Sequence, residues 1–215
     1  HGGMGFGFME VALLMEEAGR SIAPAPLAVH MAGGIAPLAR FGSAEQKARL
    51  LPGAASGEIV LTAALEEQFA LDACEPATTA RAEGGGYRVS GEKFAVPFAH
   101  CAHRVLLGAM SDAGLVVLLL DPQAAGVTLT AMKTSSYEPQ SLLVLDNVLV
   151  TAADVLAGPQ SGTEVMRFAT ECLTAALCAH QHGRTGTLRR MTATYTCERK
   201  QYGVPIATFQ AVGNR

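Results

Sequence analysis

The stretch "ERKQYGVPIATFQ", residues 198–210, follows the longest helical pattern of the chain and gathers groups suited to ligand binding. It contains an arginine, a tyrosine and two glutamines: Arg199, Tyr202, Gln201 and Gln210. An arginine presents a planar fork that matches phosphate oxygens, glutamines add hydrogen bonds, and a tyrosine ring offers a face for a purine or a flavin. These four residues are therefore candidate cofactor-binding residues.

The same stretch also predicts how a helix ends. Gly203 is expected to be the left-handed residue that ends the helix, and Pro205 prevents its continuation. Arg199 complements the negative end of the helix dipole. This purely structural interpretation explains the glycine and the proline, but it leaves the two glutamines without a role.

Upstream of this stretch, Thr163 to Lys200 contains no proline and repeats apolar residues at helical spacing, which predicts one long helix. Its middle, "LTAALCAH" at residues 173–180, is almost entirely small or apolar and suits a helix packed on several sides. Because only one short segment follows, we expect the neighbours of this helix to come from further sequence or from another subunit.

The first third of the chain is predicted to be helical. Apolar residues recur at helical spacing over residues 7–20, and a second apolar segment covers residues 27–41. Ser43 is the expected N-cap of a third helix, because Gln46 stands at the capping-box position.

Short β-branched or alternating runs replace the helical pattern from Ile59 onward. Because no helical spacer separates these runs, they predict a largely antiparallel barrel or sandwich. Within it, "GEK" at residues 91–93 is expected to form a hairpin turn with a solvated Lys93. The predicted fold is α+β, with an N-terminal helical region, a central β domain and the start of a C-terminal helical domain, at residues 1–58, 59–155 and 156–215.

Composition excludes several classes of partner. The 215 residues are 49% hydrophobic, and the net charge of -3 is spread without a basic block, so neither nucleic acid nor a membrane surface is the expected partner. The apolar run "GLVVLLL" at residues 114–120 is far shorter than the roughly 20 residues of a bilayer span. The five scattered cysteines indicate reduced thiols in a cytoplasm, and the histidines lack the spacing of a metal site. Because no initiating Met is present, we expect the chain to begin inside a longer protein.

Several motifs, taken in order, resemble the acyl-CoA dehydrogenase family. They are "GGMGFG" before a helix with "MEEAGR", then "FGSAEQKARLLP", "GYRVSGEKFAV", "LVLDNVLV" followed by "VLAG", and the closing pattern R-x-Q-aromatic-G-x-P-I-x-x-F-Q. The resemblance runs from end to end of the chain. It implies a helical region, a β domain and a helical bundle that is incomplete here.

The resemblance also implies a cofactor and a reaction. In this family two subunits share each FAD, and the segment that carries Arg199, Gln201, Tyr202 and Gln210 grips the diphosphate and adenosine half across the dimer interface. The family reaction is α,β-desaturation of an acyl-CoA, in which a carboxylate removes the α proton and the β hydrogen leaves as hydride to the flavin. An electron-transfer flavoprotein usually takes the electrons.

Departures from the family pattern concern the flavin ring. The usual L-T-E-P and G-S-D motifs are replaced in "ALEEQFALDACEP", where Leu65 and Glu67 stand for the Thr and the Pro. The hydroxyl-bearing W-I-[TS]-[NG] motif is replaced by Val96, Pro97 and Phe98. Apolar residues cannot supply the hydrogen-bond donors that a reduced flavin needs. The residues expected to contact the flavin ring are therefore lost in this sequence, whereas those expected to contact the diphosphate are present.

These substitutions resemble those of the paired chains of actinobacterial steroid side-chain degradation. The sharper hypothesis is therefore a half-site subunit of a heteromeric dehydrogenase, a heterotetramer, that works with a sister chain. The alternatives are a homo-oligomeric flavin enzyme of the same fold and an assembly subunit without flavin. The catalytic base is unknown: the position that carries it in a minority of the family is Leu173 here, and Glu171 is interpreted as a surface or interface charge.

Overall fold

The computed structural model describes residues 5–70 and 72–214, and its N-terminal part is helical. The helices are α1 (Phe8–Ser21), the π-helical segment η1 (Val29–Ile35), α2 (Ala36–Phe41) and α3 (Ala44–Ser56). The predicted capping box at the start of α3 is confirmed. The backbone N–H of Gln46 donates to Ser43 Oγ at 3.2 Å, and the backbone N–H of Ser43 donates to Gln46 Oε1 at 2.9 Å. The glycine-rich start at residues 2–7 lies partly outside the described residues.

The central part is one sheet with the strand order β6-β7-β3-β2-β4-β5-β8, and β1 joins it beside β4. Its strands are β1 (Leu61–Ala64), β2 (Thr79–Glu83), β3 (Gly86–Pro97), β4 (Arg104–Ser111), β5 (Gly114–Leu120), β6 (Val127–Met132), β7 (Gln140–Val150) and β8 (Val155–Ala157). Most pairs are antiparallel, as predicted, but β1 and β2 both run parallel to β4, so the sheet is mixed.

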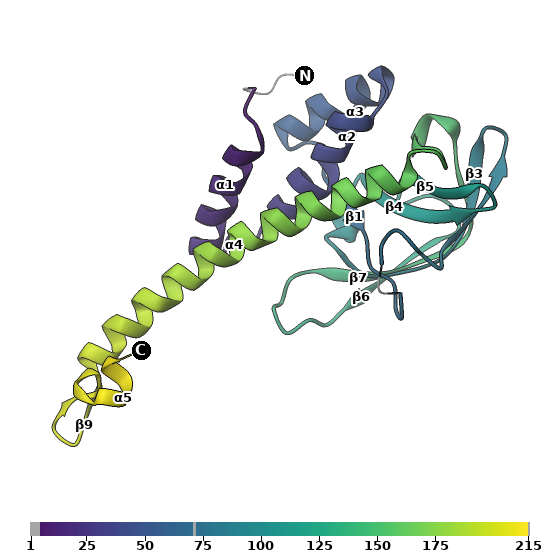
Figure 1. Ribbon diagram of the computed structural model, residues 1–215. Helices are drawn as coiled ribbons and strands as arrows, with labels where there is room; N and C mark the ends of the chain where they lie inside the picture. The colour runs from purple at the N-terminus through teal and green to yellow at the C-terminus, as the bar shows by residue number, and fades with distance from the viewer. Residues whose placement is uncertain (1–4, 71, 215) are drawn as a thin grey trace.

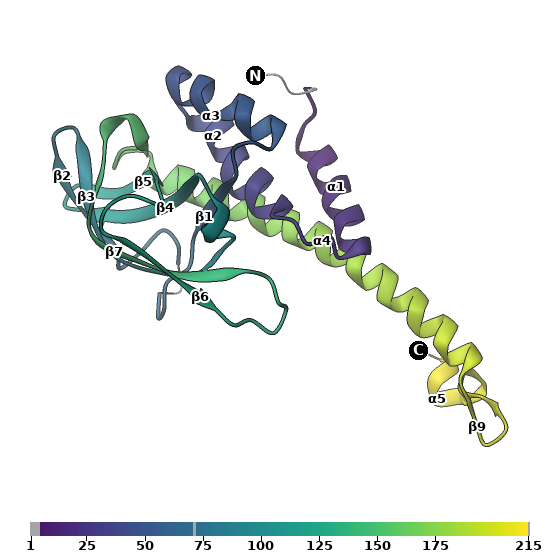
Figure 2. The same cartoon turned by 180° about the vertical axis from the view of Figure 1, so that it is seen from behind.

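Both faces of β4 and β5 are buried, which explains why the β5 sequence is continuously apolar. Val116 and Leu118 belong to the core enclosed by the curved sheet. The residues between and beside them, Leu115, Val117 and Leu119, pack with α2, α3 and α4 on the other face. The sheet thus joins two cores, and the helices cover one of its faces (Figures 1 and 2).

The long helix α4 (Gly162–Glu198) confirms the helix predicted for residues 163–200. It leaves the sheet, crosses α1 and continues alone to the C-terminal end (Figure 1). Within this chain only one face of its middle is covered, so the predicted packing on several sides, by further sequence or another subunit, stays a prediction. Ala176 is completely buried, whereas the neighbouring Leu177 is 49% exposed. Among the described residues, no helix is both long and apolar enough to cross a membrane.

Two glycines let α1 and α4 approach closely. A Cβ atom added to Gly183 would lie 1.9 Å from the Glu16 carbonyl oxygen, and one added to Gly19 would lie 1.9 Å from the His180 carbonyl oxygen. No side chain fits at such distances, so the helix crossing requires glycine at both positions.

Replacing Gly183 by alanine is expected to lower the free energy of unfolding by about 1–3 kcal/mol, because the helices must separate to admit the methyl group. Gly186 provides the matched control, since it lies one turn further along α4 and an added Cβ meets nothing within 4 Å. Gly186→Ala should stabilise the protein slightly, because alanine has the higher helix propensity. Urea denaturation of both variants measures the difference, and equal free energies would contradict the close packing of α1 on α4.

Candidate functional site

The four candidate cofactor-binding residues lie in a small unit at the end of α4, which we call the C-terminal tip (residues 199–214). It consists of the strands β9 (Lys200–Gln201) and β10 (Val204–Pro205), the turn η4 (Ile206–Thr208) and the short helix α5 (Gln210–Gly213). The strands β9 and β10 form an antiparallel hairpin. The backbone N–H of Ile206 donates to the carbonyl of Arg199 at 2.8 Å and closes the unit onto the end of α4.

The prediction that Gly203 ends the helix is wrong. The helix ends at Glu198, and Gly203 is instead the second residue of the two-residue hairpin loop. Tyr202 and Gly203 have φ angles of 54° and 81°, as a type I′ turn requires. The sequence pattern predicted correctly that Gly203 is left-handed, but it did not predict that this glycine lies in a hairpin loop.

Tyr202 occupies an unfavourable backbone position. Asn, Asp or Gly normally precedes glycine in a type I′ turn, because a bulky residue is strained at positive φ. The Tyr202 ring is nevertheless 95% exposed and touches the protein mainly through an edge-to-face contact with Phe209, at 6.3 Å between centroids. Packing within this chain therefore does not account for the tyrosine.

The polar groups of the tip are exposed. Gln201 Nε2 donates to the Lys200 carbonyl at 2.9 Å, and Gln210 is exposed at the start of α5. The Arg199 guanidinium makes no hydrogen bond or ion pair within residues 5–70 and 72–214. A free guanidinium beside two amides and an aromatic face is the donor set that the diphosphate half of FAD requires, so the tip fits that half of the cofactor.

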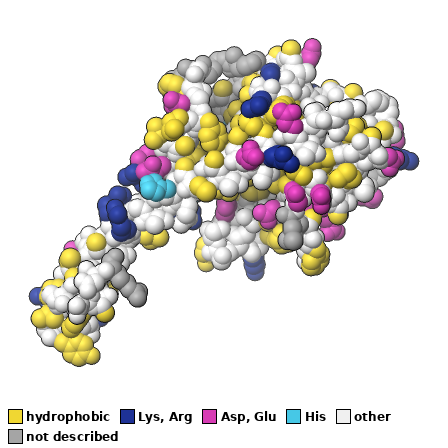
Figure 3. All heavy atoms as spheres, in the orientation of Figure 1, with side chains coloured by type: hydrophobic (Ala, Val, Ile, Leu, Met, Phe, Trp, Pro, Cys, Tyr) yellow, Lys and Arg dark blue, Asp and Glu magenta, His cyan; other side chains and the backbone are white. Residues whose placement is uncertain are grey.

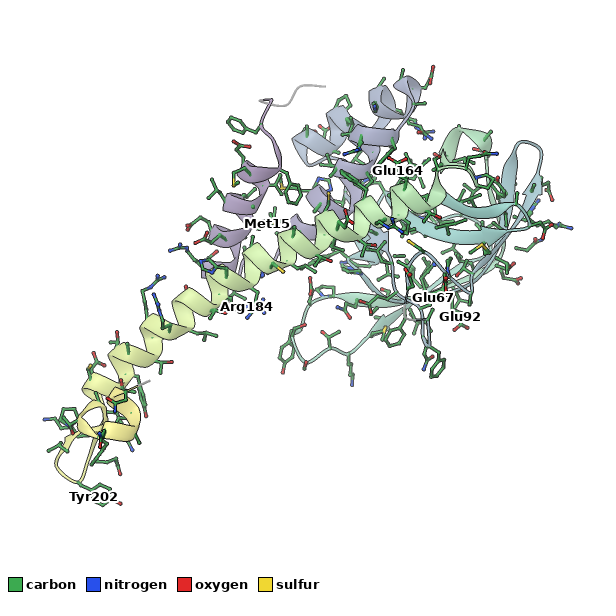
Figure 4. The ribbon with its side chains drawn as sticks, viewed as in Figure 1. Met15, Glu67, Glu92, Glu164, Arg184 and Tyr202 are labelled. Atoms are coloured by element: carbon green, nitrogen blue, oxygen red, sulfur yellow. The ribbon has the colours of Figure 1, made fainter. Side chains whose placement is uncertain are left out.

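The tip stands apart from the β domain of its own chain. The 37 residues of α4 span roughly 55 Å at 1.5 Å per residue. The tip lies at one end of this helix and the sheet at the other, as the positions of Tyr202 and Glu67 illustrate (Figure 4). A cofactor held at the tip therefore cannot reach the sheet of the same chain.

A cavity lies between α1, the loop before β7 and α4; we call it the α1–α4 cavity. Its volume is about 620 Å³. Its wall comprises Ala18, Ile22, Ala23, Pro24, Ala25, Pro26, Leu27, Ala28, Val29, Phe98, Ser136, Tyr137, Glu138, Pro139, Leu177, His180, Gln181 and Arg184. This volume is within the range of ordinary small-molecule sites, and the lining is mainly apolar with a few polar groups, as such sites usually are.

The residues expected beside a flavin ring are only partly brought together. Phe98 lines the α1–α4 cavity, whereas Val96 is completely buried in the core enclosed by the sheet. Leu65 packs at the edge of the core beneath the helices. The Thr62 Oγ1 hydroxyl donates a hydrogen bond to the Pro97 carbonyl at 2.6 Å, so this hydroxyl is not free to donate to a flavin ring. This side of the chain therefore does not fit the ring half of FAD.

The structure corrects the prediction for Lys93, which is buried rather than solvated in a turn. The Lys93 and Glu67 side chains are only 2% and 4% exposed, and Lys93 Nζ lies 2.5 Å from Glu67 Oε1. Burial acts to raise the pKa of Glu67, but the hydrogen bonds from Lys93 and Thr78 outweigh it and hold that pKa below its ordinary value. Burial lowers the pKa of Lys93. The pair holds residues 65–78 against β3.

The structure leaves the catalytic base unassigned. Glu171 is exposed on α4, as interpreted from the sequence. Leu173 points toward Gly33, with its Cδ2 3.9 Å from where a Cβ of that glycine would lie, so it offers only apolar contact. Arg184 and His180, which sequence analysis did not single out as a binding pair, meet in the α1–α4 cavity. Their i, i+4 spacing on a helix was the available signal.

Comparison with known proteins supplies the family. The model of the N-terminal domain of acyl-CoA dehydrogenase matches residues 1–58. The acyl-CoA dehydrogenase FadE28 of Mycobacterium tuberculosis is 35% identical over 211 residues, which cover 98% of this chain and 58% of that protein. FadE27 of the same organism is 32% identical over 214 residues, which cover 100% of this chain and 55% of that protein.

Solved structures agree with these sequence matches. A variant of the Tcur3481-Tcur3483 steroid ACAD has a TM-score of 0.88 and 34% identity, covering 99% of this chain and 56% of that one. The ChsE4-ChsE5 complex from Mycobacterium tuberculosis has a TM-score of 0.90 and 31% identity, with coverage of 99% and 56%. The chain thus spans a little more than half the length of the relatives that it matches. Sequence and fold together show that the chain belongs to the acyl-CoA dehydrogenase family.

Proposed function

We propose that this chain is a subunit of an FAD-dependent acyl-CoA dehydrogenase, and that its C-terminal tip holds the diphosphate of an FAD whose ring is seated in a partner chain. The observation that carries the proposal is the position of the tip. A free guanidinium, two amides and a strained exposed tyrosine stand at the far end of α4, out of reach of the sheet of the same chain.

Each tip residue has a separate task in this proposal. Arg199 pairs with the phosphate oxygens through its planar fork, and Gln201 and Gln210 donate orienting hydrogen bonds. Tyr202 offers its ring face to the adenine. The bound FAD supplies the hydride acceptor for α,β-desaturation of an acyl-CoA thioester. The residue that removes the α proton is unassigned.

An unlike sister chain is the partner that the observations favour. The flavin-ring side of this chain carries Val96, Pro97 and Phe98 in place of the family motif with its aromatic ring and hydroxyl, and it does not fit the ring. The names of two similar structures each join two chains, ChsE4-ChsE5 and Tcur3481-Tcur3483, and one is called a steroid ACAD. In more detail, the proposed assembly is a heterotetramer that acts in lipid metabolism and steroid degradation. Its electron acceptor is an electron-transfer flavoprotein. The five free cysteines support a cytoplasmic location.

The surface of α4 supports association with further protein. Beyond its crossing with α1, the helix exposes Leu188, Met191 and Tyr195 at the spacing of one helical face. Met9 and Leu13 are exposed in the same way on α1, and Figure 3 shows the apolar side chains that gather over α1. Exposed apolar surface of this kind is what protein–protein association buries.

Cofactor stoichiometry tests the proposal. The full-length chain is purified alone and after co-expression with a sister chain that carries the L-T-E-P, G-S-D and hydroxyl-bearing motifs. We expect little FAD on the chain alone and one FAD per two unlike chains in the complex, measured by flavin absorbance and native mass spectrometry. A homo-oligomer with one FAD on every copy would refute the half-site role, and a complex without any flavin would favour an assembly subunit.

A further inference from the structure

Two histidines hold the α3–β1 junction (residues 57–61) by the same kind of contact. The backbone N–H of Val60 donates to Nδ1 of His103 at 3.0 Å, and the backbone N–H of Leu61 donates to Nδ1 of His30 at 3.0 Å. His30 belongs to η1 and His103 directly precedes β4, so the two rings tie the junction to the helical region and to the sheet. We call these two hydrogen bonds the histidine clamp.

Each contact fixes the protonation state of its ring. An Nδ1 that accepts an N–H carries no proton, so each imidazole is neutral and its proton is on Nε2. The second nitrogen of His30 agrees with this, because Nε2 lies 3.1 Å from the carbonyl oxygen of Ala54 and donates to it. The backbone N–H of His103 also donates to the Val60 carbonyl at 2.7 Å, which holds this histidine beside the junction.

Adding a proton to either ring breaks its contact. The new proton on Nδ1 faces the backbone N–H that this nitrogen otherwise accepts, so two donors point at each other. Leu61 is only 2% exposed, and η1 packs directly on it, since a Cβ added to Gly34 would lie 2.4 Å from Leu61 Cβ. An unpaired backbone donor at such a place costs free energy, so protonation favours an open junction.

The surroundings of His30 supply no charge that would stabilise a protonated ring. Neither η1, β1 nor residues 50–57 at the end of α3 contain another charged residue. Arg40 of α2 lies over two phenylalanine rings, and Glu171 of α4 is exposed. Burial raises the pKa of the Cys172 thiol on α4, so this group is neutral.

The charged and titratable groups around His103 are exposed or already paired. They are Glu58, His100, Cys101, Arg104, Asp121 and Asp154. Arg104 lies between the carboxylates of Asp121 and Asp154, and its Nη1 donates to the His103 carbonyl at 2.6 Å. The histidine ion pair found among the described residues is elsewhere, between His182 and Glu16. A carboxylate therefore does not offset the cost of protonating the clamp.

We propose that the histidine clamp is a pH-sensitive device, which holds the α3–β1 junction while both rings are neutral and releases it when they take up protons. Histidine is the side chain that ordinarily changes charge between pH 5 and 8, so the response falls in this range. The clamped state binds fewer protons than the open state, so its stability is present at neutral pH and is lost as pH falls. The device is separate from the C-terminal tip and from FAD.

Hydrogen exchange measured by mass spectrometry on the purified full-length protein tests the proposal. The observable is the protection of residues 57–62 at pH 7.5 and at pH 5.5, corrected for the intrinsic exchange rate. A free histidine is half-protonated near pH 6.5, so each ring should lower the protection by up to roughly tenfold over this interval, and both rings by up to roughly 100-fold. Equal protection at the two pH values would overturn the proposal.

Asparagine variants separate the proton from the hydrogen bond. The Oδ1 of asparagine can replace Nδ1 as an acceptor and does not titrate. His30→Asn and His103→Asn should therefore each reduce the pH response by up to roughly tenfold, and the double variant should show almost none. His100→Asn is the matched control, because His100 is exposed and its ring makes no hydrogen bond among the described residues. A double variant that keeps the full response would contradict the clamp.

Nitrogen NMR of the unchanged protein, labelled at histidine, gives a test that needs no variant. At pH 7.5 the rings of His30 and His103 should both carry their proton on Nε2, and a proton on Nδ1 of either ring would overturn the proposal. Flavin content is measured separately, so failure of the clamp leaves the proposed function standing.

Discussion

Replacing Lys93 by methionine is expected to lower the free energy of unfolding by about 3–5 kcal/mol, the usual cost of leaving a buried charge without its partner. The carboxylate left behind, Glu67, also accepts hydrogen bonds from Thr78 Oγ1 and from the backbone N–H of Ala77, both at 2.6 Å. Those bonds keep the charged group inside the protein, so it cannot simply turn to solvent. Urea denaturation followed by circular dichroism measures the loss.

A double variant and an exposed control make this result specific. Glu67→Gln combined with Lys93→Met removes both charges, so part of the stability should return. The return is incomplete, because Thr78 and Ala77 donate to different carboxylate oxygens and the single amide oxygen of glutamine can replace only one of them. Lys133→Met, at an exposed position after β6, should change the free energy by less than about 0.5 kcal/mol. A Lys93→Met protein as stable as this control would show that the buried pair does not hold residues 65–78.

The same pair predicts a dependence on pH. Because the folded pKa of Glu67 lies below its unfolded value, its contribution is fully present above the unfolded pKa and is lost as pH falls through the folded one. The unchanged protein should therefore lose stability on the acid side more steeply than the double variant, which lacks the carboxylate.

Replacing Arg199 by alanine is expected to lower the affinity of the assembled complex for FAD by about 30-fold or more, because a phosphate charge is left partly desolvated and unpaired. Arg199→Lys should restore only part of this affinity, since the lysine lacks the planar fork. The measurement is the flavin content of the purified complex and its titration with FAD.

The neighbouring Lys200 supplies the control for Arg199. Lys200→Ala removes an exposed positive charge from the same hairpin and should leave FAD binding nearly unchanged. Full flavin occupancy in the Arg199→Ala complex would refute the assignment of the tip to the diphosphate. Equal losses in the two variants would point to a general electrostatic effect of the tip rather than to a fork-shaped contact.

Much of the architecture was predictable because its signals are local. The capping box of Ser43 and Gln46 defines a helix start, and the proline-free apolar pattern of residues 163–200 predicted α4 nearly to its ends. Alternating and β-branched runs predicted most of the sheet. The parallel pairing of β1 and β2 with β4 was not predictable, because it depends on how strands far apart in the sequence pair, and local sequence patterns do not indicate this.

The candidate site divides in the same way. Arg199, Gln201, Tyr202 and Gln210 were identified from their types and spacing, and their role in FAD binding remains a proposal. That Gln201 and Tyr202 lie on a hairpin, that Gln210 begins α5, and that all four residues are exposed and distant from the sheet follows only from the three-dimensional arrangement. The division of the chain into three domains also stays a prediction.

What the sequence by itself determined is the order of helices and strands and the family pattern, because capping, periodicity and turn chemistry act between residues close in the chain. The tertiary structure alone decided the burial of Lys93, whose partner Glu67 lies 26 residues away, and the meeting of Ile22, Phe98 and Arg184 at one cavity. It also decided that α1 and α4 cross at two glycines. The burial and the electrostatic environment of a side chain depend on which distant segments the fold brings into contact with it. The residues next to it in the sequence do not indicate which segments these are.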